Sequence, residues 1–137
     1  MTVLLDTNVV SAIMQRDAIA LGRLRRERPG DVFLCSPVAA EIHFGLDRLP
    51  AGRRRQLLEA EYRTFRAIVQ WADWTEVAAR EFGRLKALLE ARGQIIEDMD
   101  IAIGAVAKSL GARCATRNTR HLTRLDSLIV EDWSKAT

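Results

Sequence analysis

The stretch Val3-Leu4-Leu5-Asp6-Thr7-Asn8 decides the fold class, because an unbroken apolar run ends at an acid and then leads into a helical pattern. Val3 to Leu5 show no alternation of apolar and polar residues, which predicts a strand buried on both faces, as in a parallel sheet. Asp6 then lies at the carboxyl end of that strand, where open α/β sheets bind ligands. A simple helix cap at Asp6 or Thr7 explains this stretch equally well when it is taken alone.

The same pattern recurs along the chain. Val32 to Cys35 form a second apolar run, and Ser36-Pro37 then predicts a helix start with serine as the cap. Arg113 to Ala115 form a short strand-like segment that ends in the polar stretch Thr116 to Thr119, and Leu128 to Val130 predict a last strand before a polar tail. Strands that alternate with helices predict an α/β architecture with a mainly parallel sheet.

Size and composition predict one domain over residues 1–137, since the chain has 137 residues and 48% of them are hydrophobic. No apolar run approaches the ~20 residues that a membrane-spanning helix needs, and no basic leader precedes an apolar stretch. Cys35 and Cys114 lie in apolar segments without metal-ligand spacing, so they are expected to be small buried hydrophobes. These features favour a cytoplasmic protein with no membrane partner.

The net charge is +3, and arginines cluster at 23–28, at 53–55 and at 113–124. A run of charges is most often a solvated face. The clusters therefore permit a phosphate-rich partner without establishing one.

Three acids occupy comparable places after or between the predicted strands. Besides Asp6, Glu41 lies on the margin of the apolar face of the helix that starts near Pro37, and Asp98 lies in the first turn of a largely apolar helix. Asp98 shares a helical face with Ile101, whereas Asp100 is expected to project to another side and is the weaker candidate. Simpler alternatives remain: Glu41 could reach solvent or pair with an arginine, and Asp98 could only cap its helix.

The carboxyl ends of parallel strands meet at one edge of a sheet, so these acids are expected to converge there. Converging carboxylates repel each other and need a counterion. Clustered hard oxygen ligands suit Mg²⁺ or Mn²⁺, and such an ion can activate water and hold a phosphate. The residues themselves therefore indicate metal-dependent phosphodiester hydrolysis.

At these positions the sequence resembles the PIN-domain ribonucleases, and most of all the VapC-type toxins of bacterial toxin–antitoxin pairs, including their FitB-like branch. The resemblance covers nearly the whole chain. It rests on four motifs in order: Leu5 to Asn8, Ser36 to Glu41 with Gly45 four residues later, Asp98 to Ala102, and Thr116 to Arg120.

The resemblance implies a three-layer fold with an about five-stranded parallel sheet flanked by helices, usually in a homodimer. It also implies a set of metal-binding acids, with Mg²⁺ or Mn²⁺ as the cofactor: Asp6, Glu41 and Asp98. Asn118 matches a catalytic position that is aspartate in some members, and it would orient an acid or a water. Small polar residues are implied to support the site: Thr7, Asn8, Ser11 and Thr116.

The function that the resemblance implies is endoribonuclease activity on RNA, often tRNA or rRNA. The implied partner is a small VapB-like antitoxin that covers the acidic site and carries the pair to its own promoter DNA. Two alternatives stay open. One is a phosphatase of the haloacid dehalogenase type, which needs a second aspartate where this chain has Asn8. The other is a PIN-like module that binds RNA or protein without catalysis.

Overall fold

A five-stranded, fully parallel sheet forms the centre of the molecule, with the strand order β3-β2-β1-β4-β5. The computed structural model describes residues 1–137. The strands are β1 (Val3–Leu5), β2 (Val32–Cys35), β3 (Gln70–Ala72), β4 (Arg113–Thr116) and β5 (Val130–Asp132). The first strand is central and completely buried, as its unbroken apolar sequence predicts. The predicted parallel α/β fold is confirmed.

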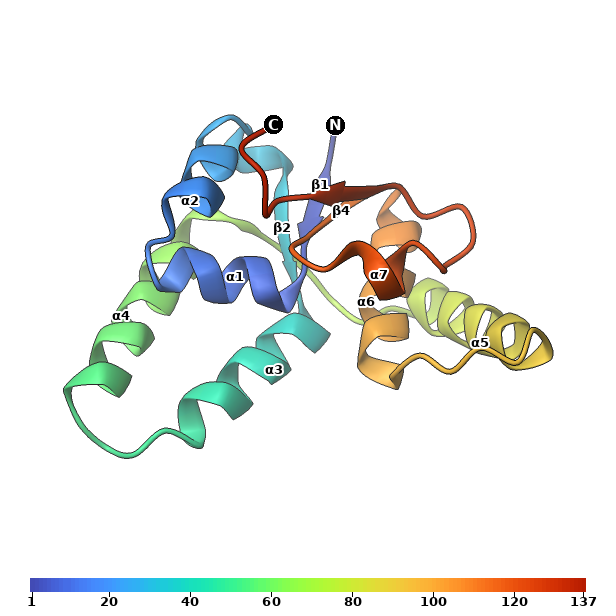
Figure 1. Cartoon of the computed structure of the whole chain (residues 1–137), viewed down its shortest axis with the longest axis horizontal. Helices are drawn as coiled ribbons and strands as arrows, with labels where there is room; N and C mark the ends of the chain where they lie inside the picture. Colours follow the sequence, from blue (N-terminus) through green and yellow to red (C-terminus); the bar gives the residue numbers. More distant parts are fainter.

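Helices cover both faces of this sheet. They are α1 (Thr7–Met14), α2 (Ala18–Arg25), α3 (Ser36–Asp47), α4 (Arg53–Ile68), α5 (Glu76–Ala91), α6 (Asp98–Leu110) and α7 (Thr119–Leu122), with a short 3₁₀ turn at Pro29–Asp31. In Figure 1, α1 to α4 lie on one side of the strands, and α5 to α7 lie on the other. None of these helices is long and apolar enough to cross a membrane.

Local side-chain bonds set several helix starts where the sequence predicts them. The Asp17 carboxylate accepts from the N–H of Ala20 at 2.9 Å, and the Thr75 hydroxyl accepts from the N–H of Ala78 at 3.1 Å. The expected serine cap of α3 is wrong by one residue. Cys35 holds the cap position, and Ser36 already belongs to the helix. Pro37 in the first turn of α3 has no backbone N–H, so one fewer N–H needs an acceptor there, and α3 begins without a side-chain cap.

The carboxyl-terminal segment differs from the expected strand and polar tail. The last strand begins only at Val130, and Trp133 behind it is 1% exposed. Its indole Nε1 donates to Glu131 Oε1 at 2.9 Å, and the Arg23 guanidinium lies 5.5 Å from the ring centroid. Arg26, the residue that ends α2, donates a 2.7 Å bond to the carbonyl oxygen of Ala136, so the end of this helix holds the end of the chain.

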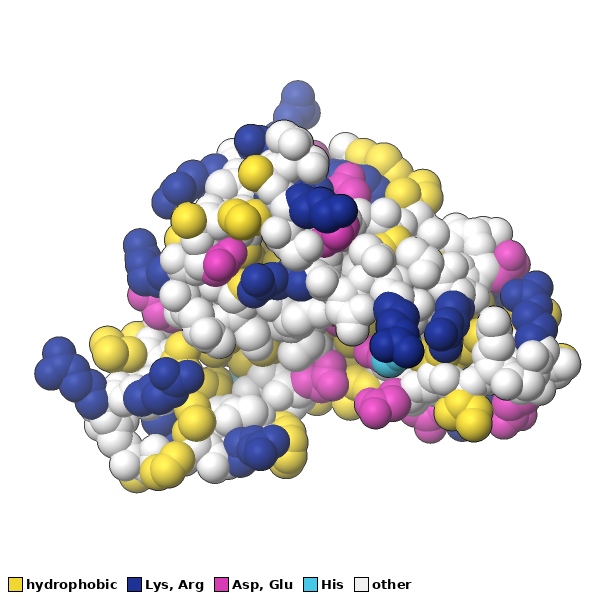
Figure 2. All heavy atoms as spheres, in the orientation of Figure 1, with side chains coloured by type: hydrophobic (Ala, Val, Ile, Leu, Met, Phe, Trp, Pro, Cys, Tyr) yellow, Lys and Arg dark blue, Asp and Glu magenta, His cyan; other side chains and the backbone are white.

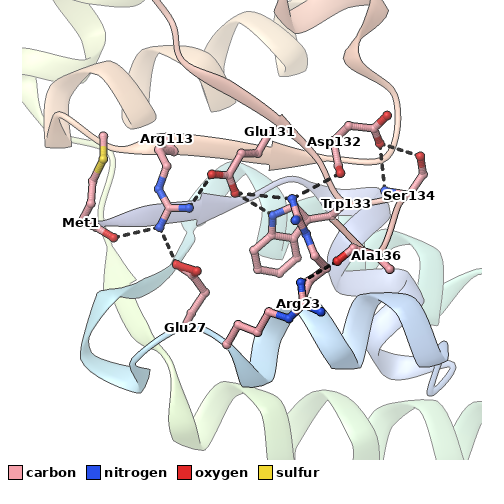
Figure 3. A network of polar contacts seen from close by, with 10 residues as sticks. Met1, Arg23, Glu27, Arg113, Glu131, Asp132, Trp133, Ser134 and Ala136 are labelled. Atoms are coloured by element: carbon pink, nitrogen blue, oxygen red, sulfur yellow. Dashed lines mark hydrogen bonds and ion pairs between the residues drawn. The ribbon is translucent and has the colours of Figure 1, made fainter.

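An ion-pair network joins the same strand to its neighbours (Figure 3). Arg113 on β4 donates to Glu131 Oε2 at 2.6 Å and to the carbonyl oxygen of Met1 at 3.0 Å, and it also pairs with Glu27. Burial alone would raise the pKa of Glu131, but the bonds from Trp133 and Arg113 outweigh burial and lower that pKa. The network therefore stabilises β5 with its glutamate ionised.

Both cysteines are completely buried and free, as predicted. Burial raises the pKa of Cys35 to about 12, which leaves its thiol protonated and unreactive at neutral pH.

Candidate active site

A cleft of about 400 Å³ opens at the carboxyl edge of the sheet, where β1, β2 and β4 end. Its lining comes from one face of α1 and the residues that flank this helix, from α3, from α6 and from the residue after β4. The lining residues are Asp6, Thr7, Asn8, Ser11, Ala12, Gln15, Glu41, Asp100 and Arg117. Figure 2 shows acidic side chains between α3 and the start of α6, with lysines and arginines around them.

Asp6 is the most buried acid of this cleft, with 7% of its surface exposed. Its Oδ1 accepts from the Thr7 N–H and its Oδ2 accepts from the Thr116 hydroxyl, both at 2.8 Å. Burial raises its pKa, the two donors oppose that rise, and the carboxylates of Asp100 and Glu41 add to it. Asp6 is thus the cap of α1 and also lines the cleft, so the cap alternative does not exclude it from the site.

Glu41 reaches the cleft from the second turn of α3. Its Oε1 accepts a hydrogen bond from the Thr7 hydroxyl, and it forms no ion pair with an arginine. Nothing lies within 4 Å of where a Cβ of Gly45 would stand, and Gly45 and Glu41 line a neighbouring pocket together. The sequence therefore placed Glu41 correctly at this edge of the sheet.

The expected position of Asp98 is wrong, because the structure brings Asp100 to the cleft in its place. The Asp98 side chain is 65% exposed, pairs with Lys86 Nζ at 3.0 Å and lines a different pocket. Asp98 does share a helical face with Ile101, as the spacing indicates, but that face packs against α5. Two residues further on, α6 has turned by about 200°, which directs Asp100 toward Asp6 and Glu41.

Asn118 does not line the cleft. Its side-chain oxygen accepts from the N–H of Arg120 at 3.2 Å and caps α7. Its backbone N–H bonds to the Thr116 hydroxyl at 3.1 Å, so it contacts the site only through that threonine. The Asn118 side chain contacts none of the acids in this structure, and its predicted part in orienting an acid or a water stays a prediction.

The predicted supporting residues do come together around Asp6. Thr116 is fully buried, and its hydroxyl contacts Asp6 and, at 3.2 Å, the Asn8 amide nitrogen. The Asn8 side-chain oxygen Oδ1 in turn accepts from the Arg117 N–H at 2.9 Å. Asn8 thus cross-links the ends of β1 and β4, and the phosphatase alternative lacks the second aspartate that it needs two residues after Asp6.

The sequence reasoning missed two residues at this edge. Arg117 is the one cation that lines the cleft, and it forms no ion pair with the acids around it. His121 on α7 places Nδ1 3.2 Å from Asp100 Oδ2. Arg117 lies in the segment Thr116 to Arg120 on which the family resemblance rests, and His121 follows it directly. The spacing of these residues in the sequence does not indicate that their side chains face the cleft.

The donor set of the cleft suits a hard divalent cation, although the carboxylates are not drawn together around one point. No group of three or more histidine, cysteine, aspartate or glutamate side chains lies close enough to hold a metal ion as the side chains stand. Even so, Asp6, Glu41 and Asp100 line one cleft, and the charges of Asp100 and Glu41 add to the burial that raises the pKa of Asp6. Carboxylate oxygens are the ligands that Mg²⁺ and Mn²⁺ prefer, so the residues fit such an ion.

Comparison with known proteins matches residues 3–128 to the PIN domain family. Ribonuclease VapC2 of Haemophilus influenzae is 27% identical over 130 residues, which cover 95% of this chain and 96% of that protein. VapC ribonuclease Y4jK of Sinorhizobium fredii is 28% identical over 139 residues, covering 98% and 99%. The crystal structure of VapBC2 from Rickettsia felis, bound to a DNA fragment from its promoter, contains a chain of the same fold, with a TM-score of 0.86 at 24% identity and coverage of 97% and 99%.

Proposed function

Because the chain belongs to the PIN-domain family, we propose that it is a metal-dependent endoribonuclease, the toxin of a bacterial toxin–antitoxin pair. Its reaction is hydrolysis of phosphodiester bonds in RNA, with tRNA or rRNA as the substrate class. The observation that carries this proposal is the meeting of three carboxylates in one cleft at the carboxyl edge of the sheet. Carboxylates that repel one another and the phosphates of RNA favour a metal-dependent nuclease over a module that only binds RNA.

Asp6, Glu41 and Asp100 would hold Mg²⁺ or Mn²⁺ in this cleft. Such an ion, when bound, activates water and stabilises charge on the phosphate. The chain's own residues supply the rigidity, because Thr116 and the Thr7 N–H fix the Asp6 carboxylate while the Thr7 hydroxyl fixes Glu41. Asp98 has no place in this ligand set.

Arg117 would bind the RNA backbone at the cleft. An arginine that forms no ion pair keeps its guanidinium available for phosphate oxygens, to which it can donate two parallel hydrogen bonds. Its backbone is held by Asn8 at 2.9 Å, so the side chain starts from a fixed point beside the acids. Asn118 supports the same region from behind by capping α7.

The partner in this proposal is a cognate VapB-like antitoxin that covers the acidic cleft and offers it a basic side chain. The toxin would act as a homodimer in the cytoplasm, and the pair would contact promoter DNA through the antitoxin. The Rickettsia felis VapBC2 structure, which is bound to promoter DNA, supports this arrangement by analogy.

A cleavage assay with a matched pair of aspartate variants tests the proposal. Antitoxin-free protein is incubated with total tRNA and rRNA in Mn²⁺, Mg²⁺ or EDTA, alongside Asp100→Asn and Asp98→Asn. We expect discrete fragments that disappear with EDTA and with Asp100→Asn but persist with Asp98→Asn. Loss of cleavage in Asp98→Asn alone would overturn the choice of the third acid. Absence of both cleavage and Mn²⁺ binding in the wild type would favour the binding-module alternative.

A further inference from the structure

We infer that His121 is a positioning residue that holds the Asp100 carboxylate in place for the divalent cation, an inference that rests on the function proposed above. The His121 Nδ1 atom lies 3.2 Å from Asp100 Oδ2, and the two side chains are 41% and 27% exposed. With a proton on Nδ1, the imidazole donates this hydrogen bond to the carboxylate. The residue does not itself line the cleft.

The contact completes a pattern that all three acids share. Asp6 accepts a hydrogen bond from the Thr116 hydroxyl, and Glu41 accepts one from the Thr7 hydroxyl. Without His121, Asp100 would be the one carboxylate of the cleft whose orientation no donor fixes. The bond from His121 holds Asp100 Oδ2, whereas Asp100 Oδ1 has no protein partner. Neighbouring donors that orient ligating carboxylates in this way strengthen metal binding.

Close packing of two segments brings His121 to Asp100. Asp100 and Gly104 lie four residues apart on one face of α6, and His121 and Leu125 lie four residues apart on the facing segment. A Cβ added at Gly104 would stand only 2.3 Å from Leu125 Cδ1, so glycine is what lets the two segments approach. Leu122 and Leu125 are 2% and 3% exposed, and they anchor the segment that carries the histidine.

The same helix contains a natural comparison. Asp98 also has one side-chain partner from another element, Lys86 at 3.0 Å, but this pair lies outside the cleft. Removal of Lys86 therefore deletes a partner of an α6 aspartate without touching the proposed ligand set. Lys86→Ala is the matched control for any variant of His121.

The test measures Mn²⁺ affinity of the whole chain by calorimetry, together with the gain in melting temperature that Mn²⁺ produces. The variants are His121→Ala, His121→Asn, Lys86→Ala and Asp100→Asn. We expect His121→Ala to weaken Mn²⁺ binding by about 10-fold, with most of the loss restored in His121→Asn, whose amide can donate from near the Nδ1 position. Lys86→Ala should bind Mn²⁺ like the wild type.

Each other outcome identifies what failed. Wild-type Mn²⁺ affinity in His121→Ala, with affinity lost in Asp100→Asn, would overturn the role of His121 and leave the proposed site standing. Wild-type affinity in Asp100→Asn would overturn the proposed site and this inference together. If both His121 variants bound Mn²⁺ more weakly and their metal-free melting temperatures fell equally, the effect would come from the packing of α7. That outcome would also overturn the role of His121.

Discussion

The Thr116 hydroxyl donates a 2.8 Å hydrogen bond to Asp6 Oδ2, and this bond joins the ends of the adjacent strands β4 and β1 at the floor of the acidic cleft. The threonine is fully buried and the aspartate is 7% exposed. Two residues separated by 110 positions in the sequence thus form one unit. The stability of the sheet edge and the charge of the site depend on the same contact.

Thr116→Val should therefore damage both stability and metal binding. Valine keeps the shape but leaves Asp6 Oδ2 and the Asn118 N–H without a partner, and leaving a buried polar group unpaired costs about 1–3 kcal/mol. Urea denaturation measures that loss, and calorimetry with Mn²⁺ measures the weaker binding. Thr64→Val, on the exposed face of α4, is the control and should change stability by less than about 0.5 kcal/mol. Equal effects of the two variants would contradict the importance of the buried bond.

Removal of the Asp6 charge should stabilise the metal-free protein at neutral pH. Burial raises the pKa of Asp6 in the folded state above its usual value of 3.8, so the folded protein binds this proton more tightly than the unfolded chain does. Stability from this group is therefore greatest below pH 3.8 and falls as pH rises through the raised folded-state pKa. Asp6→Asn has no such loss, so its advantage over the wild type should grow from acid to neutral pH.

The measurement for Asp6→Asn is the free energy of unfolding across that pH range, without and with Mn²⁺. Saturating Mn²⁺ should reverse the order of stability, since only the wild type retains the carboxylate for the ion. A difference between the two proteins that stays constant with pH would show that burial of Asp6 does not control its ionisation.

The sequence predicts the fold well because its determinants are local. The apolar runs at β1 and β2 and the caps at Asp17 and Thr75 lie within a few residues of the elements they define. Asp6 and Glu41 are predictable for the same reason. Asp6 comes directly after β1, and Glu41 lies about one and a half turns into the helix that follows β2. The assignment of residues 1–137 to one domain stays a prediction.

The third acid depends on packing that periodicity does not reveal. Ile101 and Ile103 are 2% and 0% exposed, so α6 is buried on several sides and its apolar pattern does not single out the face toward the cleft. The motif expects isoleucine and alanine three and four residues after the acid, which Asp98 has in Ile101 and Ala102. Asp100 has isoleucine at the same spacing but glycine after it, so the sequence pattern favours Asp98. Only the contacts of α6 with α5 and with the segment after β4 decide which aspartate reaches the site.

Arg113→Ala should destabilise the protein without altering its metal site. The substitution removes the cation shared by Glu27 and Glu131, and such charged hydrogen bonds contribute about 1.5–3 kcal/mol each. Because the depressed pKa of Glu131 stabilises the fold above pH 4.5, the stability lost in Arg113→Ala should shrink as pH falls below that value. Thermal unfolding between pH 3 and 7 measures this, with Mn²⁺ affinity expected to stay at the wild-type value. A parallel fall in Mn²⁺ affinity would show that the network reaches the cleft.

Arg117→Ala should weaken RNA binding in a way that depends on salt. When a protein binds single-stranded RNA, each arginine–phosphate contact contributes about −0.7 to the slope of log affinity against log salt concentration. The variant is best measured in an Asp100→Asn background, where binding is followed without cleavage, and its slope should be shallower by that amount. Arg28→Ala is the matched control, because Arg28 is exposed and precedes β2 at the opposite edge of the sheet. Equal slopes for the two variants would mean that Arg117 does not contact the RNA backbone, whereas a selective change would place a phosphate beside the three carboxylates of the cleft.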